Sequence, residues 1–431
     1  MSEAAAAAER IVARCRELAR VTDVPGQTTR TFLSPATREA HALVRGWMCG
    51  AGLRVWTDAI GNLRGVTEAA TDAPRLVIGS HLDTVIDAGA FDGPLGVVMG
   101  IQLAEAIGAQ PALPFAIEVI GFSEEEGVRF AKPFLGSLAV IGEMDDALLR
   151  QVDAEGVSVA RAVQEFGVEE NRVEDAVPAA STFAYLEFHI EQGPVLEAEG
   201  LSLAIVDAIA GQTRMQVKFR GHANHAGTTP MGRLRKDAVA AAAEWIGEVE
   251  RYANGCAGLV ATVGKIEVPG GAGNVIAGEC VATLDMRHAK DEVRGAAVTH
   301  LVKAAEHAAS ARGVSVECRT MLEQPAVAMD AVLTDAVANA CKRVVGPNLR
   351  RITSGAGHDA MIVARRVPSA MVFLRSPGGL SHHPEESVLV GDVEAAYAAG
   401  LEFLRTLRDD RAMLDRLVGS ALQYDREVRF A

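Results

Sequence analysis

Short apolar runs alternate along the chain with longer segments whose apolar residues recur at helical spacing. Residues 75–79 and 115–122 have the pattern of buried strands, and residues 95–107 between them have the pattern of a buried helix. This strand–helix–strand order predicts an α/β fold with a mainly parallel sheet covered by helices. Residues 371–374 resume the strand pattern near the C-terminus.

Between residues 211 and 323 the order of the predicted elements changes. It becomes strand, helix, two strands, helix and strand, over residues 214–220, 236–252, 259–266, 278–286, 291–311 and 314–320. This order is typical of the ferredoxin-like, split βαβ sandwich. We therefore predict a metal-binding catalytic domain of residues 1–211 and 324–431, interrupted by a smaller domain of residues 212–323. The polar residues 152–180 are predicted only as an irregular helical excursion.

The composition is that of a large globular protein. With 431 residues, 49% of them hydrophobic, the chain can bury enough apolar surface for two domains. A formal net charge of −14 and scattered basic residues argue against binding to nucleic acid or to an acidic membrane. No apolar stretch approaches the roughly 20 residues that a membrane-spanning helix needs.

The N-terminal segment and the cysteines both indicate a cytoplasmic protein. Glu9, Arg10, Arg14 and Arg16 interrupt the alanine-rich start before an apolar leader can form, so we predict a surface helix there. The six cysteines are far apart and form no CxxC pair, which predicts free thiols in a reducing compartment.

Three side chains suited to metal chemistry lie in one short segment after the apolar run of residues 76–79. His81, Asp83 and Asp92 offer an imidazole and two carboxylates, which suit divalent ions better than a thiolate site does. This segment is the strongest functional signal in the chain, so the remaining ligands are sought near other strand ends.

Two further histidines and an acidic run follow strand-like segments in the same way. His189 and His382 come after apolar runs, and residues 124–126 are three glutamates directly after a predicted strand. Ligands gather at the carboxyl ends of the strands in such sheets, so these motifs are expected to meet. A lone loop histidine is as often a hydrogen-bonded structural residue, but four such motifs together favour a metal site.

A two-ion centre can be assembled from these residues. Asp92 is predicted to bridge the ions, with His81 and His189 completing one of them and Glu126 and His382 completing the other. Such a pair of ions lowers the pKa of a shared water and polarises a carbonyl group.

Asp83 and Glu125 are predicted to support this centre. Asp83 is suited to accept the second imidazole N–H of His81, although it can instead make a turn. Adjacent side chains of an extended segment point apart, so Glu125 is predicted to face the attacking water as general base while Glu126 binds metal. Glu124 is predicted to be a surface or supporting residue. Alternatively the whole acidic run is a solvated loop.

The inserted domain carries candidate substrate contacts. His225 lies in the Gly- and Thr-rich loop 221–230 and is predicted to reach a substrate carbonyl. Arg287 offers a planar guanidinium suited to a carboxylate, and Asn274 lies at the other end of the same predicted strand. Alternatively Asn274 makes a turn, and Arg287 pairs with Asp285 or with surface acids.

A second glycine-rich loop, residues 354–359, is a weaker candidate for a ligand contact. Its backbone around Gly357 and His358 is predicted to approach the substrate. It ranks below the metal-binding set.

Several of these motifs together resemble the amidase/carbamoylase branch of the dinuclear zinc-peptidase superfamily. The resemblance extends from about residue 30 to the C-terminus and rests on His-Leu-Asp at 81–83, Asp-Gly at 92–93, Glu-Glu-Gly-Val-Arg-Phe at 125–130, His-Ile-Glu-Gln-Gly-Pro at 189–194, His-Ala-Gly-Thr-Thr-Pro-Met at 225–231, Asn-Val-Ile at 274–276 and Ser-His at 381–382. The branch includes allantoate amidohydrolases, N-carbamoyl-L-amino acid hydrolases, β-ureidopropionases and ureidoglycolate amidohydrolases. Residues 30–35, 45–48, 79–89, 127–130 and 209–214 are most similar to the allantoate amidohydrolases.

The resemblance implies a role for each matching residue. It implies Glu125 as base, His225 as a residue that reaches across a homodimer joined through the smaller domain, and a set of ligands made of His81, Asp92, Glu126, His189 and His382. It implies substrate contacts at Gln192, Gln212, Asn274 and Arg287. His383 is a departure, because relatives often have Asn or Ser there, but the Ser-His register favours His382 as the ligand.

These observations predict a cytoplasmic, homodimeric amidohydrolase with two divalent ions per subunit. Mn²⁺ is the first expectation, and Zn²⁺, Co²⁺ or Ni²⁺ are the alternatives. The predicted reaction converts a small anionic ureide, allantoate, to ureidoglycine, ammonia and carbon dioxide. N-carbamoyl-L-amino acid or ureidoglycolate hydrolysis are alternatives within the class, and a non-catalytic metal-dependent binding module is the alternative from another class.

Overall fold

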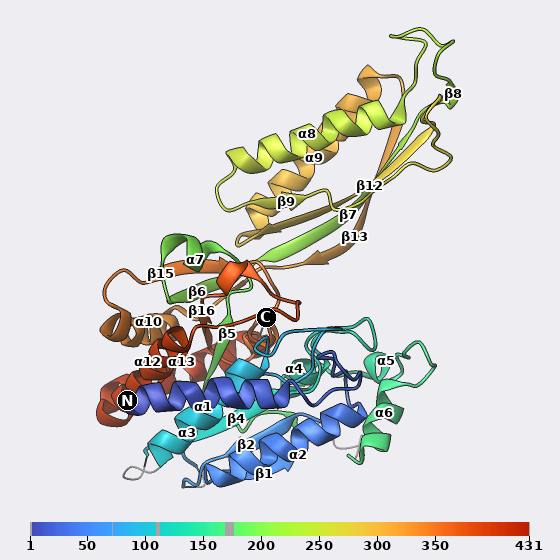
Figure 1. Cartoon of the computed structure of the whole chain (residues 1–431). Coiled ribbons are helices and arrows are strands. Elements are labelled where there is room, and N and C mark those ends of the chain that lie inside the picture. Colours follow the sequence, from blue (N-terminus) through green and yellow to red (C-terminus); the bar gives the residue numbers. More distant parts are fainter. Residues whose placement is uncertain (1, 71, 109–112, 169–175, 431) are drawn as a thin grey trace. The chain divides into compact units, whose positions relative to one another are not determined.

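The computed structural model describes residues 2–70, 72–108, 113–168 and 176–430 (Figure 1). The chain divides into two compact units. Unit 1 comprises Met1–Asp207 and Met329–Ala431, and unit 2 comprises Ala208–Ala328. Within the described residues, no helix has both the length and the apolar character needed to cross a membrane.

Unit 1 is built on a mixed sheet whose centre is parallel. Its strand order is β1-β2-β4-β3-β5-β16-β6-β14, with β15 paired to β6. The strands are β1 (Arg54–Thr57), β2 (Leu63–Val66), β3 (Arg75–His81), β4 (Ala116–Phe122), β5 (Thr182–Ile190), β6 (Leu203–Ile209), β14 (Val327–Ala328), β15 (Arg350–Ser354) and β16 (Ser369–Leu374). The series β4-β3-β5-β16 is parallel, whereas β1, β2, β6 and β14 pair antiparallel. The predicted mainly parallel sheet is confirmed, and the antiparallel edges were not predicted.

Amphipathic helices cover this sheet. The nearly all-apolar α3 (Pro94–Gly108) packs on β3, β4 and β5. The predicted N-terminal surface helix is α1 (Glu3–Leu18), which buries one face against α3 and α12 (Val390–Asp409). The other helices described in unit 1 are α2 (Pro35–Gly50), α4 (Leu135–Val140), α5 (Asp146–Leu149), α6 (Val159–Phe166), α7 (Val195–Glu199), α10 (Ala331–Val345), α11 (Asp359–Val363), the 3₁₀ helix η2 (Pro377–Gly379) and α13 (Arg411–Phe430). Of the predicted excursion over 152–180, α6 is helical, and residues 169–175 lie outside the described residues.

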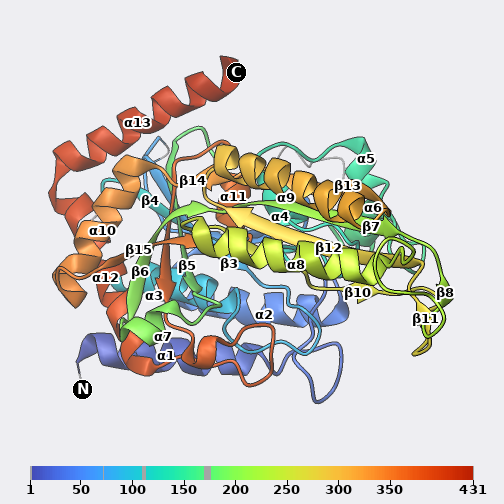
Figure 2. The ribbon, with the colours of Figure 1, turned by 90° about the horizontal axis from the view of Figure 1, so that it is seen from above.

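Unit 2 is an antiparallel sheet with two long helices on one face (Figures 1 and 2). The sheet order is β10-β12-β7-β13, with β9 paired to β12, which is the split βαβ arrangement. The elements are β7 (Gly211–Arg220), β8 (Asn224–His225), α8 (Ala238–Gly255), β9 (Val260–Thr262), β10 (Ile266–Glu267), β11 (Val275–Ile276), β12 (Glu279–His288), α9 (Asp291–Ala311) and β13 (Ser315–Gln324). The helices pack on the alternate buried residues of β7 and β12.

One strand predicted for unit 2 is interrupted. Residues 259–266 form two short strands, because Thr262 pairs with Asp285 while Ile266 pairs with Ala282. The chain thus advances four residues from Thr262 to Ile266, while the facing strand β12 advances only three, from Asp285 to Ala282. The extra residue is a β-bulge, and Gly264 lies within it, at a place where a glycine commonly marks such a break.

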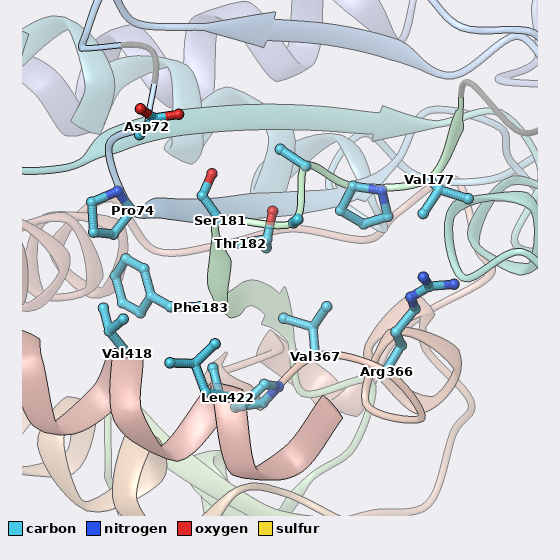
Figure 3. A pocket seen from close by; sticks show the side chains of 15 residues that line it. Asp72, Pro74, Val177, Ser181, Thr182, Phe183, Arg366, Val367, Val418 and Leu422 are labelled. Carbon is cyan, nitrogen blue, oxygen red and sulfur yellow. The ribbon is translucent and has the colours of Figure 1, made fainter. Parts of the chain in front are cut away.

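A cavity of about 380 Å³ in unit 1 lies at the amino-terminal ends of β3 and β5 (Figure 3). Pro74 precedes β3, Phe183 lies at the start of β5, and Leu422 of α13 lines the cavity as well. The predicted ligands His81 and His189 lie at the carboxyl ends of the same two strands. The cavity is therefore at the opposite edge of the sheet from the predicted metal centre.

His41 of α2 makes the fold sensitive to acid. Its ring is buried edge-on against Phe166, and neither ring nitrogen has a hydrogen-bond partner. Burial, together with the guanidinium groups of Arg45, Arg30 and Arg38, lowers the pKa of His41 from 6.5 to about 3. The unfolded chain therefore binds a proton at His41 as the pH falls through 6.5, whereas the His41 ring of the folded chain stays neutral. The free energy of unfolding decreases as a result. Linkage gives a loss of about 2 kcal/mol by pH 5.

A His41→Leu variant is expected to lack this loss. Chemical unfolding of metal-free protein at pH 7.5 and pH 5 measures it: the parent should lose about 2 kcal/mol more than His41→Leu between the two pH values. His307→Leu is the matched control, because His307 of α9 is exposed. It should lose as much unfolding free energy between the two pH values as the parent does. Equal pH dependence in all three proteins would contradict the prediction.

Candidate metal centre

Four neighbouring parallel strands bring the predicted ligands together. His81 ends β3, Glu126 lies just after β4, His189 lies near the end of β5, and His382 follows β16 and η2. These strands are adjacent in the order β4-β3-β5-β16, so their carboxyl ends lie along one edge. Asp92 comes from the loop between β3 and α3.

The Asp92 carboxylate lies at the centre of the cluster. Its Oδ1 is 3.6 Å from His81 Nε2 and 3.2 Å from His189 Nε2. Its Oδ2 is 3.4 Å from His382 Nε2, which in turn lies 3.7 Å from Glu126 Oε1. Asp92 thus belongs to two potential metal-binding groups, one with His81 and His189 and the other with Glu126 and His382. These are the two groupings that the sequence predicts.

The imidazole orientations fit metal binding. Nδ1 of His81 lies 3.0 Å from the Asp83 carbonyl oxygen, and Nδ1 of His189 lies 2.9 Å from that of Ile190. A carbonyl only accepts, so both Nδ1 atoms carry a proton and both Nε2 atoms face Asp92. Nε2 of His189 is buried without a hydrogen-bond partner.

The distances around Asp92 also suit a shared cation better than hydrogen bonds. The His81 distance of 3.6 Å is too long for a hydrogen bond. Two ligands about 2.1 Å from one tetrahedral ion lie about 3.4 Å apart, which is close to the separations observed here. The residues present therefore fit a divalent metal ion.

The carboxylates around Asp92 have too little positive charge near them to offset their burial and mutual repulsion. Burial, opposed by His81 but reinforced by Asp92 and Asp83, raises the pKa of Glu126 to about 8. Burial, opposed by His81 and reinforced by Glu126, also raises the pKa of Glu125 well above its usual range. Divalent cations would relieve this repulsion and return both groups to the ionised form.

Asp83 orients the acidic loop. Its carboxylate accepts the backbone N–H of Glu125 at 3.0 and 3.1 Å and that of Glu126 at 3.1 Å. The expected bond from His81 to this carboxylate is corrected: the carboxylate is 3.5 Å from Nδ1, and the Asp83 backbone carbonyl is the nearer acceptor. The neighbouring Glu124 is fully buried, so a surface position for it was wrong.

The backbone at Gly93 allows His81 to approach. Gly93 has φ +84°, and a Cβ there would lie 2.4 Å from the His81 ring. Only glycine leaves room for that ring beside the turn that follows Asp92.

The predicted residue Gln192 and the neighbouring Ser381 lie beside Asp92. Gln192 Nε2 donates to Asp92 Oδ2 at 2.8 Å, and the Ser381 hydroxyl donates to the same oxygen at 2.6 Å. Gln192, expected to contact substrate, therefore holds the central carboxylate in this structure. His382 and not His383 faces Asp92, because His383 is exposed and its Nδ1 accepts the N–H of Glu385.

Gly357 and His358 differ in accessibility. Gly357 is exposed, as a backbone contact to a ligand requires. The His358 ring is buried 4.4 Å from the His189 ring, and its Nε2 lies 2.9 Å from the Ser354 hydroxyl. Burial and His189 lower the pKa of His358 well below its usual range. The ring of His358 is therefore neutral and packs against His189, and the backbone contact predicted for this loop stays a prediction.

The predicted residues of unit 2 form two separate groups. His225 lies in the β8–β11 ribbon and Asn274 directly precedes β11, and both are exposed. Nδ1 of His225 accepts the N–H groups of Gly227 and Thr228 at 3.1 and 3.2 Å, which places its proton on Nε2. This ring is thus prepared to donate a hydrogen bond to an oxygen.

Arg287 and Gln212 are direct neighbours across β12 and β7. Arg287 binds Asp285 through Nε at 2.8 Å and Nη2 at 3.2 Å, which is the ion pair that the sequence left as an alternative. Arg214 donates to the same carboxylate at 2.9 Å. Gln212 donates to Gln324 at 2.7 Å.

The buried carboxylate of Glu187 was missed from the sequence. It accepts from the Ser80 hydroxyl at 3.0 Å, the Tyr185 hydroxyl at 3.1 Å and the Ala360 N–H at 2.9 Å. It belongs, with His189 and His358, to another potential ligand group. The available signal was a charged residue within an otherwise apolar strand, since a buried charge needs partners.

A mainly parallel sheet with imidazoles and carboxylates converging at the ends of its strands is the arrangement expected of a metal-dependent hydrolase. Residues 77–407 match the model of "Peptidase family M20/M25/M40", and the chain belongs to this family.

Several family members are similar over nearly the whole chain. Allantoate deiminase 1 of Glycine max is 41% identical over 429 residues, which cover 92% of this chain and 89% of that protein. N-carbamoyl-L-amino acid amidohydrolase of Geobacillus stearothermophilus is 39% identical over 382 residues, which cover 88% and 93%. The crystal structure of a hydantoinase/carbamoylase family amidase from Burkholderia multivorans superposes with a TM-score of 0.87 at 31% identity and covers 93% and 98% of the two chains.

Proposed function

We propose that this chain is an amidohydrolase that binds two divalent ions and hydrolyses a ureido C–N bond of allantoate. The observation that carries the proposal is the Asp92 carboxylate, whose two oxygens face separate sets of ligands. The substrate rests on the 41% identity to allantoate deiminase 1 of Glycine max. Mn²⁺ is the proposed metal, with Zn²⁺, Co²⁺ or Ni²⁺ as alternatives, because imidazole and carboxylate ligands suit these ions.

The chain's own residues carry the proton transfers. When bound, the two ions polarise the ureido carbonyl and lower the pKa of the attacking water. Glu125 takes a proton from this water as its oxygen attacks the carbonyl carbon. The C–N bond to the terminal nitrogen then breaks, and Glu125 returns the proton to the departing ammonia. The carbamate that remains loses carbon dioxide and leaves ureidoglycine.

Unit 2 is proposed to bind the substrate and to join two subunits into a cytoplasmic homodimer. His225 of the partner subunit donates its Nε2–H to the oxyanion, a role that its Nδ1 acceptor bonds support. Asn274 and Arg287 hold the substrate carboxylate, while Gln192, Gln212 and the backbone of Gly357 hold the ureido groups.

The test is turnover by Mn²⁺-reconstituted protein on allantoate, beside N-carbamoyl-L-amino acids and ureidoglycolate. Ammonia and ureidoglycine from allantoate, at the highest kcat/KM of the panel, are expected. Preferred release of a free amino acid would assign the second candidate function, which the 39% identity to the Geobacillus enzyme supports. Binding without turnover of any of these compounds would reject an enzymatic role.

An Arg287→Ala variant is expected to lower kcat/KM on allantoate about 10- to 100-fold, because charge-assisted hydrogen bonds to a carboxylate are lost. The variant should lose far less on an uncharged ureide of similar size. Steady-state rates on both compounds measure the difference.

Arg214→Ala is the matched control for this prediction. Arg214 binds the same Asp285 carboxylate from β7, so its removal reports the cost of disturbing that ion pair alone. Equal losses in the Arg287 and Arg214 variants would reject the carboxylate contact and leave Arg287 as a structural partner of Asp285.

A further inference from the structure

Glu386 binds the backbone that carries the central carboxylate. Its Oε1 accepts the N–H of Phe91 at 2.8 Å and the N–H of Asp92 at 3.0 Å. The residue is only 5% exposed, so water competes little for these bonds. Asp92 and Glu386 are 294 positions apart in sequence.

The two segments are fitted closely at this point. A Cβ on Gly89 would lie 2.3 Å from the Glu386 Cβ, so the loop before Asp92 can approach only because residue 89 is glycine. Glu386 Oε2 also lies 3.4 Å from the Ser381 hydroxyl, which donates to Asp92 Oδ2 at 2.6 Å. Glu386 therefore contacts both the backbone of Asp92 and the group that orients its side chain.

Glu386 also closes the turn that carries His382. Its N–H donates to the His383 carbonyl at 3.0 Å. His382 itself has φ +55°, a left-handed conformation that a histidine keeps only when its surroundings hold it. Glu386 thus connects the loop of Asp92, through its side chain, to the turn of a proposed ligand, through its backbone.

The three other proposed ligands are held independently of Glu386. His81 and His189 are oriented by the carbonyl oxygens of Asp83 and Ile190, and Glu126 by the Asp83 carboxylate. Within the described residues, Glu386 makes no hydrogen bond to Asp83 or Ile190, which orient these ligands. A defect at Glu386 should therefore act on the His382 side of the centre.

We propose that Glu386 is a positioning residue that sets the distance between Asp92 and His382, and that it thereby controls occupancy of the ion held by Asp92, Glu126 and His382. The inference rests on the proposed two-ion centre but not on the identity of the substrate.

The test is titration of metal-free protein with Co²⁺, followed by visible absorption and by equilibrium dialysis. The parent should bind two ions, and Glu386→Ala should keep the affinity for one and lose about 10- to 100-fold for the other, the usual effect of removing a group that orients a ligand. Activity of the variant should recover as the metal concentration rises. Glu385→Ala is the matched control, since it removes the same charge from the adjacent, exposed position.

Two conservative variants separate positioning from folding. Glu386→Gln keeps an oxygen acceptor at the same reach and should bind the second ion nearly as the parent does. Glu386→Asp keeps the charge but is one methylene shorter, so it should resemble Glu386→Ala. Thermal unfolding of the metal-free proteins shows which variants fold. If Glu386→Ala does not fold, Glu386→Gln and Glu386→Asp can still be compared.

Each outcome decides between the two proposals. Two ions bound at parental affinity by Glu386→Ala and Glu386→Asp would overturn the positioning role, as would equal weakening of both ions. A parent that binds two ions yet hydrolyses no ureide would reject the proposed function and leave the role of Glu386 intact.

Discussion

A Glu125→Gln variant is expected to keep two metal ions per chain and to lose ureide hydrolysis by about 10²- to 10⁴-fold, the usual contribution of a positioned general base. Glu125 lies with His81 and Glu126 in one group of potential ligands, yet it is not among the residues that surround Asp92. The amide is nearly isosteric, so the loop held by Asp83 should be retained. Metal analysis beside steady-state rates measures both halves of the prediction.

Glu126→Gln gives the necessary contrast. Glu126 Oε1 lies 3.7 Å from His382 Nε2, so its replacement should weaken one ion as well as activity. If Glu125→Gln instead loses an ion and Glu126→Gln does not, the two glutamates have exchanged roles. Loss of metal from both would place Glu125 among the ligands.

The pH dependence of kcat is a second readout for the same residue. Burial raises the pKa of Glu125 in the protein without metal, and bound cations lower it again. In the metal-loaded parent, kcat is therefore expected to fall at a lower pH than the raised pKa of Glu125 in the metal-free protein implies. This fall should be missing from the residual activity of Glu125→Gln.

The sequence was sufficient to predict which residues meet at the centre. His81 and His189 lie at the ends of apolar runs, while Glu126 and His382 lie in the segments that follow two others. Parallel strands bring such ends together whatever the details of packing. The βαββαβ order of unit 2 could also be predicted, because the spacing of apolar residues differs clearly between its strands and its helices.

The hydrogen bonds around these residues were less predictable. Gln192 and His382 have left-handed backbone conformations. The direction of side chains beside such a residue cannot be inferred from the two-residue period of a strand or the 3.6-residue period of a helix. The burial of the His358 ring against His189 was not predicted, because it depends on the packing of β16 and α11. Glu386 gave no signal, because its partner is 294 residues away.

Some elements were too short for any pattern to indicate. β8 and β11 have two residues each, so the ribbon that carries His225 shows no alternation. The bulge at residues 263–265 interrupts a predicted strand at Gly264, and one glycine within a strand pattern does not fix the position of a bulge. For Arg287 the sequence left two partners open, and the structure shows the pair with Asp285, two positions away on the same face of β12.

Replacing Asp92 should have the widest effect of any single change. Asp92→Asn is expected to bind neither ion at parental affinity and to lower kcat by more than about 10³-fold, because one carboxylate serves both groups of ligands and loss of even one electrostatic contact costs about 10²- to 10³-fold. The amide can still accept from Gln192 and Ser381, so the loop should keep its fold. Co²⁺ titration and thermal unfolding of metal-free protein measure the two properties separately.

Asp87→Asn is the control for this change, because it makes the same substitution in the same loop. Asp87 has φ +54°, a conformation that asparagine tolerates, and it belongs to none of the potential ligand groups. It should bind two ions and hydrolyse the substrate as the parent does. Two ions retained by Asp92→Asn would show that the centre does not depend on a bridging carboxylate. One ion retained, with His81 and His189 still required for it, would restrict Asp92 to the His382 side and confine its role to the ion that Glu386 is proposed to control.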